Sequence, residues 1–240
     1  MIPGGGGGIA FFQLVRSDAE VHLFTALGND DGARFVERAI SVTSATVHAA
    51  RRSQPHTRDV AMIDPSGERT IIVIGEPLHP RADDPMAWDV LEQLDAVYFT
   101  AQDPALLVLA RRARLLVVPA RRRECIAASG VRIDVIVGSR ADPRECSTRA
   151  DYAISPPAVV MTEGPRGGTV ETSSGVARFS SPHVQAARGS YGAGDSFAGA
   201  LTYYLAAGRS PLDAATRAAH HGAAVVASLD PLAAQLPLPR

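Results

Sequence analysis

Short runs of β-branched and aromatic residues alternate along this chain with longer segments rich in Ala, Leu and Arg. This alternation is typical of βαβ units, in which parallel strands are flanked by helices. The predicted strands are residues 21–27, 96–101, 114–120, 134–139 and 158–164. The predicted helices between them are residues 84–94, 103–113 and 122–130, the first two opening with Asp-Pro as cap and first helical residue. The pattern predicts an α/β fold with a mostly parallel sheet.

Two other segments have patterns of their own. Residues 57–76 hold two β-rich runs joined by the turn-forming residues 64–67, which predicts an antiparallel hairpin. We expect this hairpin to form a small β lid within about residues 40–80. Near the C-terminus, Gly208 ends one predicted helix, and a second is predicted over residues 210–229.

Composition narrows the classes of function. The chain has 240 residues, 46% of them hydrophobic, which suits a single domain over residues 1–240. A formal net charge of −1 gives no overall field that would attract nucleic acid or a membrane surface. The sequence shows no apolar run of about 18 residues and no export signal. Cys125 and Cys146 have neither disulfide-framework nor metal-ligand spacing, which is typical of a reducing compartment. Taken together, these features lead us to expect a cytoplasmic protein that binds a small molecule and has no nucleic-acid or membrane partner.

All 24 basic residues are arginines. P-loop, protein-kinase and Schiff-base sites each require a lysine ε-amine, so these three classes are excluded. The arginine-rich residues 111–124 raise a nucleic-acid alternative, but a strand divides the arginines and no aromatic residues interleave them. We therefore interpret these arginines as solvated helix ends.

Gly192, Ala193 and Gly194 directly precede Asp195 and a run of helix-forming residues. The first amides of a helix lack partners within the helix and lie at its positive end, so they can bind an anion where glycine leaves the approach open. Asp195 would lie beside that anion and could accept a proton from an attacking hydroxyl. The pattern favours phosphoryl transfer, and the residues alone leave open the alternative that Asp195 is simply a helix cap.

The sequence GSYGAGDSFAGAL, residues 189–201, resembles the C-terminal signature of the ribokinase-like, or PfkB-type, carbohydrate kinases. Five further segments resemble motifs of that family in the same order: PGGGGGIAFFQLVR, LFTALGNDDGARF, MIDPSGERTIIV, LLVVPARR and AVVMTEGPRGG. Six segments in register cover nearly the whole chain and support the resemblance together. It implies a ribokinase-like fold, with a central, mostly parallel sheet flanked by helices and a small β lid.

The resemblance implies ATP-dependent phosphorylation of a hydroxyl on a sugar, nucleoside or related small molecule. Asp195 would be the catalytic base, and the amides of Gly192, Ala193 and Gly194 would form the anion hole for the transferred γ-phosphoryl group. ATP and Mg²⁺ are the implied cofactors, while a monovalent cation and a homodimer are left open. The residues that would line the nucleotide are Ser139, Thr162, Gly164, Gly167, Gly222 and Ala223. Those that would face the acceptor are Gly4, Gly5, Asp103 and Asp195.

The chain departs from the family pattern in three places. It opens on the glycine-rich segment, so we expect the family's usual N-terminal strand to be lacking. Ile9 stands where members carry an Asn that contacts the sugar. The family's magnesium-associated Asn-x-x-Glu element reads Ser139-x-x-Asp142 here, and Glu145 follows three residues later. If Asp142 or Glu145 contributes to metal binding, we expect the contact to be made through a water molecule. These departures favour the alternative of a weak or inactive homologue that binds nucleotide or sugar as a sensor or regulatory protein.

Overall fold

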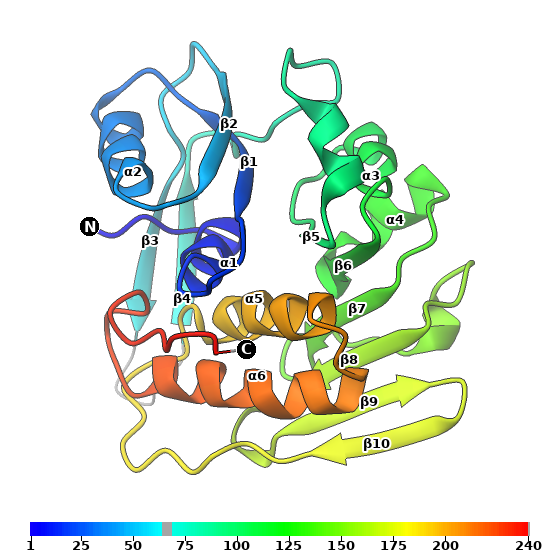
Figure 1. Ribbon diagram of the computed structural model, residues 1–240. Helices are drawn as coiled ribbons and strands as arrows, with labels where there is room; N and C mark the ends of the chain where they lie inside the picture. The colour runs from blue at the N-terminus through cyan, green and yellow to red at the C-terminus, as the bar shows by residue number, and fades with distance from the viewer. Residues whose placement is uncertain (64–68, 240) are drawn as a thin grey trace.

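A six-stranded sheet forms the centre of the computed structural model, which describes residues 1–63 and 69–239 (Figure 1). Four adjacent strands are parallel: β5 (Ala96–Tyr98), β6 (Leu115–Pro119), β7 (Val135–Ser139) and β8 (Ala158–Thr162). Two antiparallel strands continue the sheet beyond β8, namely β9 (Gly168–Thr172) and β10 (Gly175–Phe179). β6, β7 and β8 are buried almost throughout, as expected for strands covered on both faces. The predicted α/β fold with a mostly parallel sheet is confirmed.

Helices pack on both faces of this sheet. One face carries α5 (Ala193–Ala206) and α6 (Pro211–Val226), and the other carries α3 (Pro104–Ala110) and α4 (Arg123–Ser129). Successive residues of a strand point to opposite faces. Val117 of β6 therefore joins the core under α5 and α6, whereas Leu116 and Val118 join the core under α3 and α4. Both cores lie against the sheet, which leaves the ends of the strands free to form a site.

The N-terminal third adds strands that lie outside the six-stranded sheet. β1 (His22–Leu27) and β2 (Thr46–Arg51) pair in parallel, and β3 (Arg58–Ile63) and β4 (Arg69–Ile74) form the predicted antiparallel hairpin. The turn expected at residues 64–67 lies outside the described residues. This third also holds α1 (Gly6–Leu14), which packs along α5, and α2 (Asp31–Ser41). β1 and β5 are thus end strands of two different sheets. The single-domain organisation and the lid role of the hairpin stay predictions.

The helix predicted over residues 84–94 is wrong, because only the 3₁₀ helix η1 (Trp88–Gln93) forms there. Asp84, the expected cap, forms an ion pair with Arg52 at 2.7 Å and accepts the amide of Arg81 at 2.6 Å. Its carboxylate is therefore unavailable to the first turn of an α-helix at this place. The other predicted helices and the five predicted strands are present with trimmed ends.

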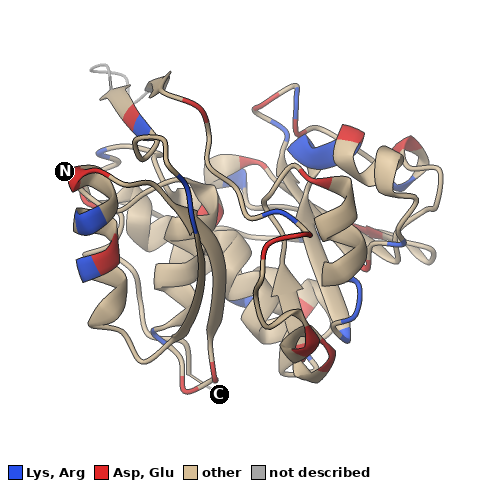
Figure 2. Ribbon diagram, turned by 90° about the horizontal axis from the view of Figure 1, so that it is seen from above, with Lys and Arg blue, Asp and Glu red and all other residues tan. Residues whose placement is uncertain are grey.

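Acidic and basic residues are interspersed over the helices and loops, while the central strands carry few of either (Figure 2). This distribution agrees with the net charge of −1, which gives no overall field of one sign. Within the parts of the chain that the structure describes, no helix has both the length and the apolar character needed to cross a bilayer.

The buried His221 on α6 makes the stability of the fold depend on pH. Its side chain is 3% exposed, and its Nε2 lies 3.2 Å from the hydroxyl of Tyr204. Burial, followed by the charge of His220, lowers the pKa of His221 to about 4. The unfolded chain regains an ordinary histidine pKa of about 6.5, so it binds a proton that the folded chain excludes between these two values. The stability contributed by neutral His221 is therefore fully present above about pH 6.5 and is lost as the pH falls toward 4.

We expect this loss to approach about 3 kcal/mol of unfolding free energy near pH 4. Urea unfolding of the parent and of His221→Gln between pH 7.5 and 4.5 measures it, with His220→Gln as the matched control. The pH slope should flatten in His221→Gln and persist in His220→Gln. Equal slopes in the parent and His221→Gln would remove His221 from the explanation.

Candidate active site

The glycine-rich turn before α5 is closed on one side and open on the other. Gly192 occupies the N-cap position with φ 79°, a left-handed conformation that favours glycine. A Cβ on Gly192 would lie 2.8 Å from Pro231 and 3.0 Å from Ile9, whereas a Cβ on Gly194 would meet no atom within 4 Å. No side chain caps α5. The first amides of a long helix are thus left without a capping side chain beside open space, which suits an anion.

Asp195 lies in the first turn of α5 but does not cap the helix. The alternative in which it is simply an N-cap is wrong, because Gly192 holds that position. The Asp195 carboxylate is about one-fifth exposed, and its Oδ1 lies 3.5 Å from Nη2 of Arg121. The start of α1 packs against this pair, since a Cβ on Gly6 would lie 2.7 Å from Asp195 Oδ1 and 2.5 Å from Arg121 Nη2. Three segments far apart in the sequence therefore meet at one carboxylate.

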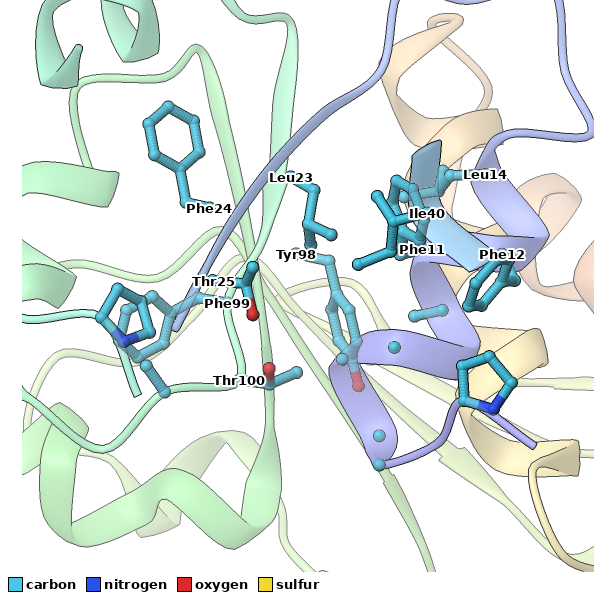
Figure 3. A pocket seen from close by; sticks show the side chains of 18 of the residues that line it. Phe11, Phe12, Leu14, Leu23, Phe24, Thr25, Ile40, Tyr98, Phe99 and Thr100 are labelled. Carbon is cyan, nitrogen blue, oxygen red and sulfur yellow. The ribbon is translucent and has the colours of Figure 1, made fainter. Parts of the chain in front are cut away.

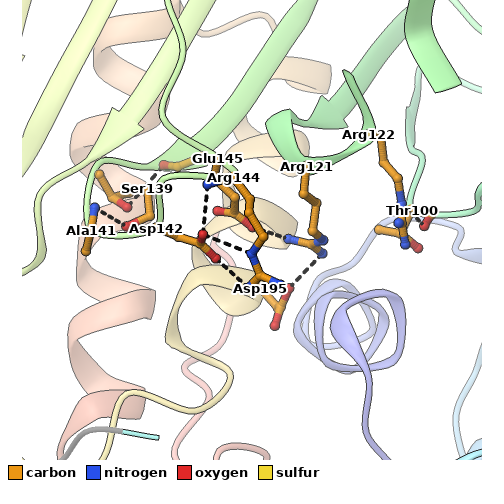
Figure 4. A network of polar contacts seen from close by, with 11 residues as sticks. Thr100, Arg121, Arg122, Ser139, Ala141, Asp142, Arg144, Glu145 and Asp195 are labelled. Atoms are coloured by element: carbon orange, nitrogen blue, oxygen red, sulfur yellow. Dashed lines mark hydrogen bonds and ion pairs between the residues drawn. The ribbon is translucent and has the colours of Figure 1, made fainter. Parts of the chain in front are cut away.

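Two separate groups of ion pairs lie between Asp195 and the end of β7 (Figure 4). Nη1 of Arg121 donates to Oε1 of Glu145 at 2.7 Å, and Arg144 pairs with Asp142 at 2.8 Å. Each of the two carboxylates expected near a metal is thus paired with an arginine. No group of three His, Cys, Asp or Glu side chains that could hold a metal ion occurs among residues 1–63 and 69–239. The two arginine-paired carboxylates therefore do not form a site that would hold Mg²⁺ by protein ligands alone.

The residues predicted to line a nucleotide come from strand ends and turns at the same edge of the sheet. Ser139 and Thr162 are the last residues of β7 and β8 and lie opposite each other in register. Gly164 (φ 59°) and Gly167 (φ 81°) bound the turn into β9, and a Cβ on Gly167 would come within 2.0 Å of the Phe179 carbonyl oxygen. Ligands of α/β proteins commonly bind beyond the carboxyl ends of parallel strands.

The last two predicted nucleotide residues, Gly222 and Ala223, lie on α6 beside the start of α5. A Cβ on Gly222 would stand 3.2 Å from the carbonyl oxygen of Ala193. The absence of a side chain on Gly222 therefore allows α6 to approach the N-terminal turn of α5 closely. This contact brings α6 next to the first turn of α5.

A cavity of about 1130 Å³ lies between the end strands β1 and β5 (Figure 3). Leu23 and Thr25 of β1 face Tyr98 and Thr100 across it. Burial is the main cause that raises the pKa of the Tyr98 hydroxyl well above its usual value, so this hydroxyl stays protonated at neutral pH. One end of the cavity is formed by the start of α1 together with the two arginines that follow β6. The residues at that end are Gly4, Gly5, Gly6, Gly7, Thr100, Arg121 and Arg122.

The structure brings some of the predicted acceptor residues together and separates one. Gly4 and Gly5 line the cavity, and the next residue, Gly6, contacts Asp195. Asp103 instead caps α3, accepting the amide of Ala105 at 2.9 Å and that of Ala82 at 3.1 Å. It lines a smaller hollow of about 400 Å³.

Sequence analysis missed Arg121 and Arg122 as site residues. The interpretation of residues 111–124 as solvated helix ends holds for Arg112 and Arg114, whose side chains are 43% and 62% exposed. It does not hold for Arg121, whose side chain is 30% exposed and forms ion pairs with two carboxylates. Arg122 is likewise half-buried at the cavity wall. Their position directly after a predicted parallel strand was the available signal, because such ends commonly form sites.

Comparison with known proteins agrees with this geometry. The sequence pattern of the family described as pfkB family carbohydrate kinase matches residues 122–236, which include Asp195 and every predicted nucleotide residue. No curated protein matches the chain in sequence.

Solved structures share the fold at low sequence identity. The ribokinase from Thermotoga maritima is 19% identical, with a TM-score of 0.78 over 98% of this chain and 85% of its own. The fructokinase with bound ATP from Xylella fastidiosa is 16% identical, with a TM-score of 0.79 over 97% and 87%. The adenosine kinase from Sinorhizobium meliloti is 15% identical, with a TM-score of 0.78 over 95% and 79%. The chain thus has the ribokinase-like fold, and its residues 122–236 match the PfkB family of carbohydrate kinases.

Proposed function

We propose that this protein transfers the γ-phosphoryl group of ATP to a hydroxyl of a sugar, nucleoside or related small molecule. The observation that carries the proposal is Asp195, set one turn into a helix whose first amides have no capping side chain. The start of α1, which lines the cavity, packs against the same carboxylate. The match of residues 122–236 to the PfkB family and the likeness to an ATP-bound fructokinase support ATP as the phosphoryl donor.

In the proposed reaction, Asp195 accepts the proton of the acceptor hydroxyl as its oxygen attacks the γ-phosphorus. A bond forms between that oxygen and the γ-phosphorus, and the bond from the γ-phosphorus to the β–γ bridging oxygen breaks. The bonding electron pair stays on that bridging oxygen, so ADP leaves. The amides of Gly192, Ala193 and Gly194 stabilise the charge on the transferred group, because they are fixed in place before the reaction begins.

The nucleotide would lie along the carboxyl edge of the sheet. Ser139 and Thr162 end neighbouring strands there, and Gly164 and Gly167 place no side chains at the two ends of the following turn. Gly222 and Ala223 would complete the site from α6. Mg²⁺ would neutralise phosphate charge when it accompanies ATP, and the proposed steps require no metal held by Asp142 or Glu145, since arginines pair with both.

A coupled ADP-release assay over a panel of sugars, sugar derivatives and nucleosides tests the proposal. We expect ADP release above the background ATPase rate with at least one acceptor, and mass spectrometry should show that acceptor gaining one phosphoryl group. Binding of nucleotide and acceptor without any acceptor-stimulated turnover would contradict the kinase proposal and support a sensor or regulatory protein instead.

A further inference from the structure

The last segment of the chain packs against two helices of the candidate active site. We call residues 230–238 the C-terminal strap, which follows α6 and turns back beside α1 and α5 (Figure 1). Nε2 of Gln13 on α1 donates to the carbonyl oxygen of Leu236 at 2.8 Å, and the amide of Leu238 donates to the carbonyl oxygen of Arg16 at 3.0 Å. Leu238 is 3% exposed and joins the core under α5 and α6. The strap is therefore a packed part of the fold.

Gln235 is the residue of the strap that bonds to both helices at once. Its buried side-chain Nε2 donates to the carbonyl oxygen of Ile9 on α1 and to Oγ of Ser196 on α5, each at 2.9 Å. Because a carbonyl oxygen only accepts, the amide of Gln235 must present its nitrogen here. Pro231 of the strap lies against the same end of α5, since a Cβ on Gly192 would come within 2.8 Å of it. One buried amide thus bridges two helices where a lost hydrogen bond is costly.

The two acceptors of this bridging amide lie beside the proposed reacting groups. Ser196 directly follows Asp195, and its own amide donates to the carbonyl oxygen of Gly192 at 2.9 Å, which closes the first turn of α5. Ile9 packs against that turn, since a Cβ on Gly192 would lie 3.0 Å from its Cδ1. Earlier on α1, a Cβ on Gly6 would lie 2.7 Å from Oδ1 of Asp195. The spacing of α1 and α5 therefore fixes where the base lies relative to the glycine segment, and the bridging amide joins the two helices there.

We propose that Gln235 is a positioning residue that holds the first turn of α5 against α1 and so keeps Asp195 and the first amides of α5 in place for phosphoryl transfer. The inference rests on the proposed kinase function and adds to it a residue 39 positions beyond Ser196 in the sequence. Gln235 acts through Ser196 and Ile9, so it is not a catalytic residue. Such a bridge matters because a misplacement of about 1 Å in a reacting group can cost about 100-fold in rate.

Gln235→Met tests the bridge, because methionine is similarly long and flexible but has no donor. We expect kcat for acceptor-stimulated ADP release to fall about 10- to 100-fold, with KM for ATP and acceptor within about threefold, since no binding group is removed. Gln13→Met is the matched control, because Gln13 is equally buried and also donates to a strap carbonyl, but from the last turn of α1. It should keep kcat within twofold, and thermal unfolding checks that both variants fold. Equal falls in kcat would give Gln235 a merely structural role and overturn the proposal.

Ser196→Ala removes the α5 half of the bridge with a smaller change. We expect its kcat to fall at least about threefold with KM unchanged, and this variant keeps the proposal testable if Gln235→Met does not fold. In the double variant, Gln235→Met should cost less than it does in the parent, because the two residues share one contact. Full additivity of the two losses, or a parent kcat in Ser196→Ala, would show that Gln235 does not act through α5 and would overturn the proposal.

Amide hydrogen exchange of Ser196, followed by NMR, reports on the bridge without any turnover. We expect exchange at least about tenfold faster in Gln235→Met and unchanged in Gln13→Met, because only the first variant loosens the first turn of α5. Faster exchange in a protein that releases no ADP with any acceptor would leave the bridge standing and overturn the kinase. ADP release with an unchanged kcat in Gln235→Met would leave the kinase standing and overturn this inference.

Discussion

Replacement of Asp195 by Asn is expected to lower kcat by about 10³-fold and to leave acceptor affinity within about threefold, since a positioned general base contributes roughly 10²- to 10⁴-fold. Asn has nearly the same shape, and its amide oxygen can still accept from Arg121, whose Nη2 lies 3.5 Å from Asp195 Oδ1 in the parent. The substitution therefore removes the proton acceptor without removing a contact. Acceptor-stimulated ADP release gives kcat, and titration with acceptor in the absence of ATP gives affinity.

Asp213→Asn is the matched control for this experiment. Asp213 lies in the first turn of α6, is about two-fifths exposed and pairs with Arg217 at 3.0 Å. Its loss removes the same charge from the same place in a neighbouring helix, and we expect kcat to stay within twofold. An Asp195→Asn enzyme that retains more than about a third of the parent kcat would mean that another group accepts the proton.

The strands of the main sheet could be predicted because each is a local signal. β6, β7 and β8 are continuous apolar runs bounded by polar or glycine-containing segments, and no knowledge of their partners is needed to recognise them. The start of α5 could be predicted for the same reason, because its signal, Gly192 to Asp195, lies within four consecutive residues. Features of this kind can be predicted without knowing which distant residues they will contact.

The five-glycine segment shows why other parts could not be predicted. Glycine costs about 1 kcal/mol relative to alanine inside a helix, so residues 4–8 gave no reason to expect α1. The helix forms because its glycines allow contacts that side chains would block: Gly6 against Arg121 and Asp195, and Gly7 against Thr100. Tertiary packing here overrides local propensity.

The roles of Arg121 and Arg122 were hidden for a related reason. Arg121 and Asp195 are 74 residues apart, and nothing in either local sequence indicates the other. Whether an arginine after a strand faces solvent or a site depends on which elements cover that strand end, and this is a property of the assembled sheet. The same argument applies to Asp84, whose partner Arg52 lies 32 residues away.

Replacement of Gly194 by Ala is expected to lower kcat/KM by about 10²-fold while the protein stays folded. An added Cβ meets no atom within 4 Å, and Gly194 lies in the first turn of α5 with no positive φ, so Ala fits the backbone. Stability should be unchanged or higher, because Ala reduces the entropy of the unfolded chain. The methyl group would nevertheless occupy the open space where the proposed phosphoryl group approaches the amides. Loss of one donor to such a group costs about 10²- to 10³-fold.

Gly192→Ala, two residues earlier in the same turn, separates this effect from damage to the fold. Gly192 has φ 79°, and its added Cβ would lie 2.8 Å from Pro231 and 3.0 Å from Ile9, so we expect a loss of about 1–3 kcal/mol in unfolding free energy. Steady-state kinetics and urea unfolding on both variants compare them directly. Gly194→Ala should lose activity while its unfolding free energy is unchanged or higher. Gly192→Ala should lose unfolding free energy whether or not its activity changes. A stable, fully active Gly194→Ala would show that the phosphoryl group does not lie at this helix start, because an anion hole cannot accommodate a methyl group and the phosphate in the same space.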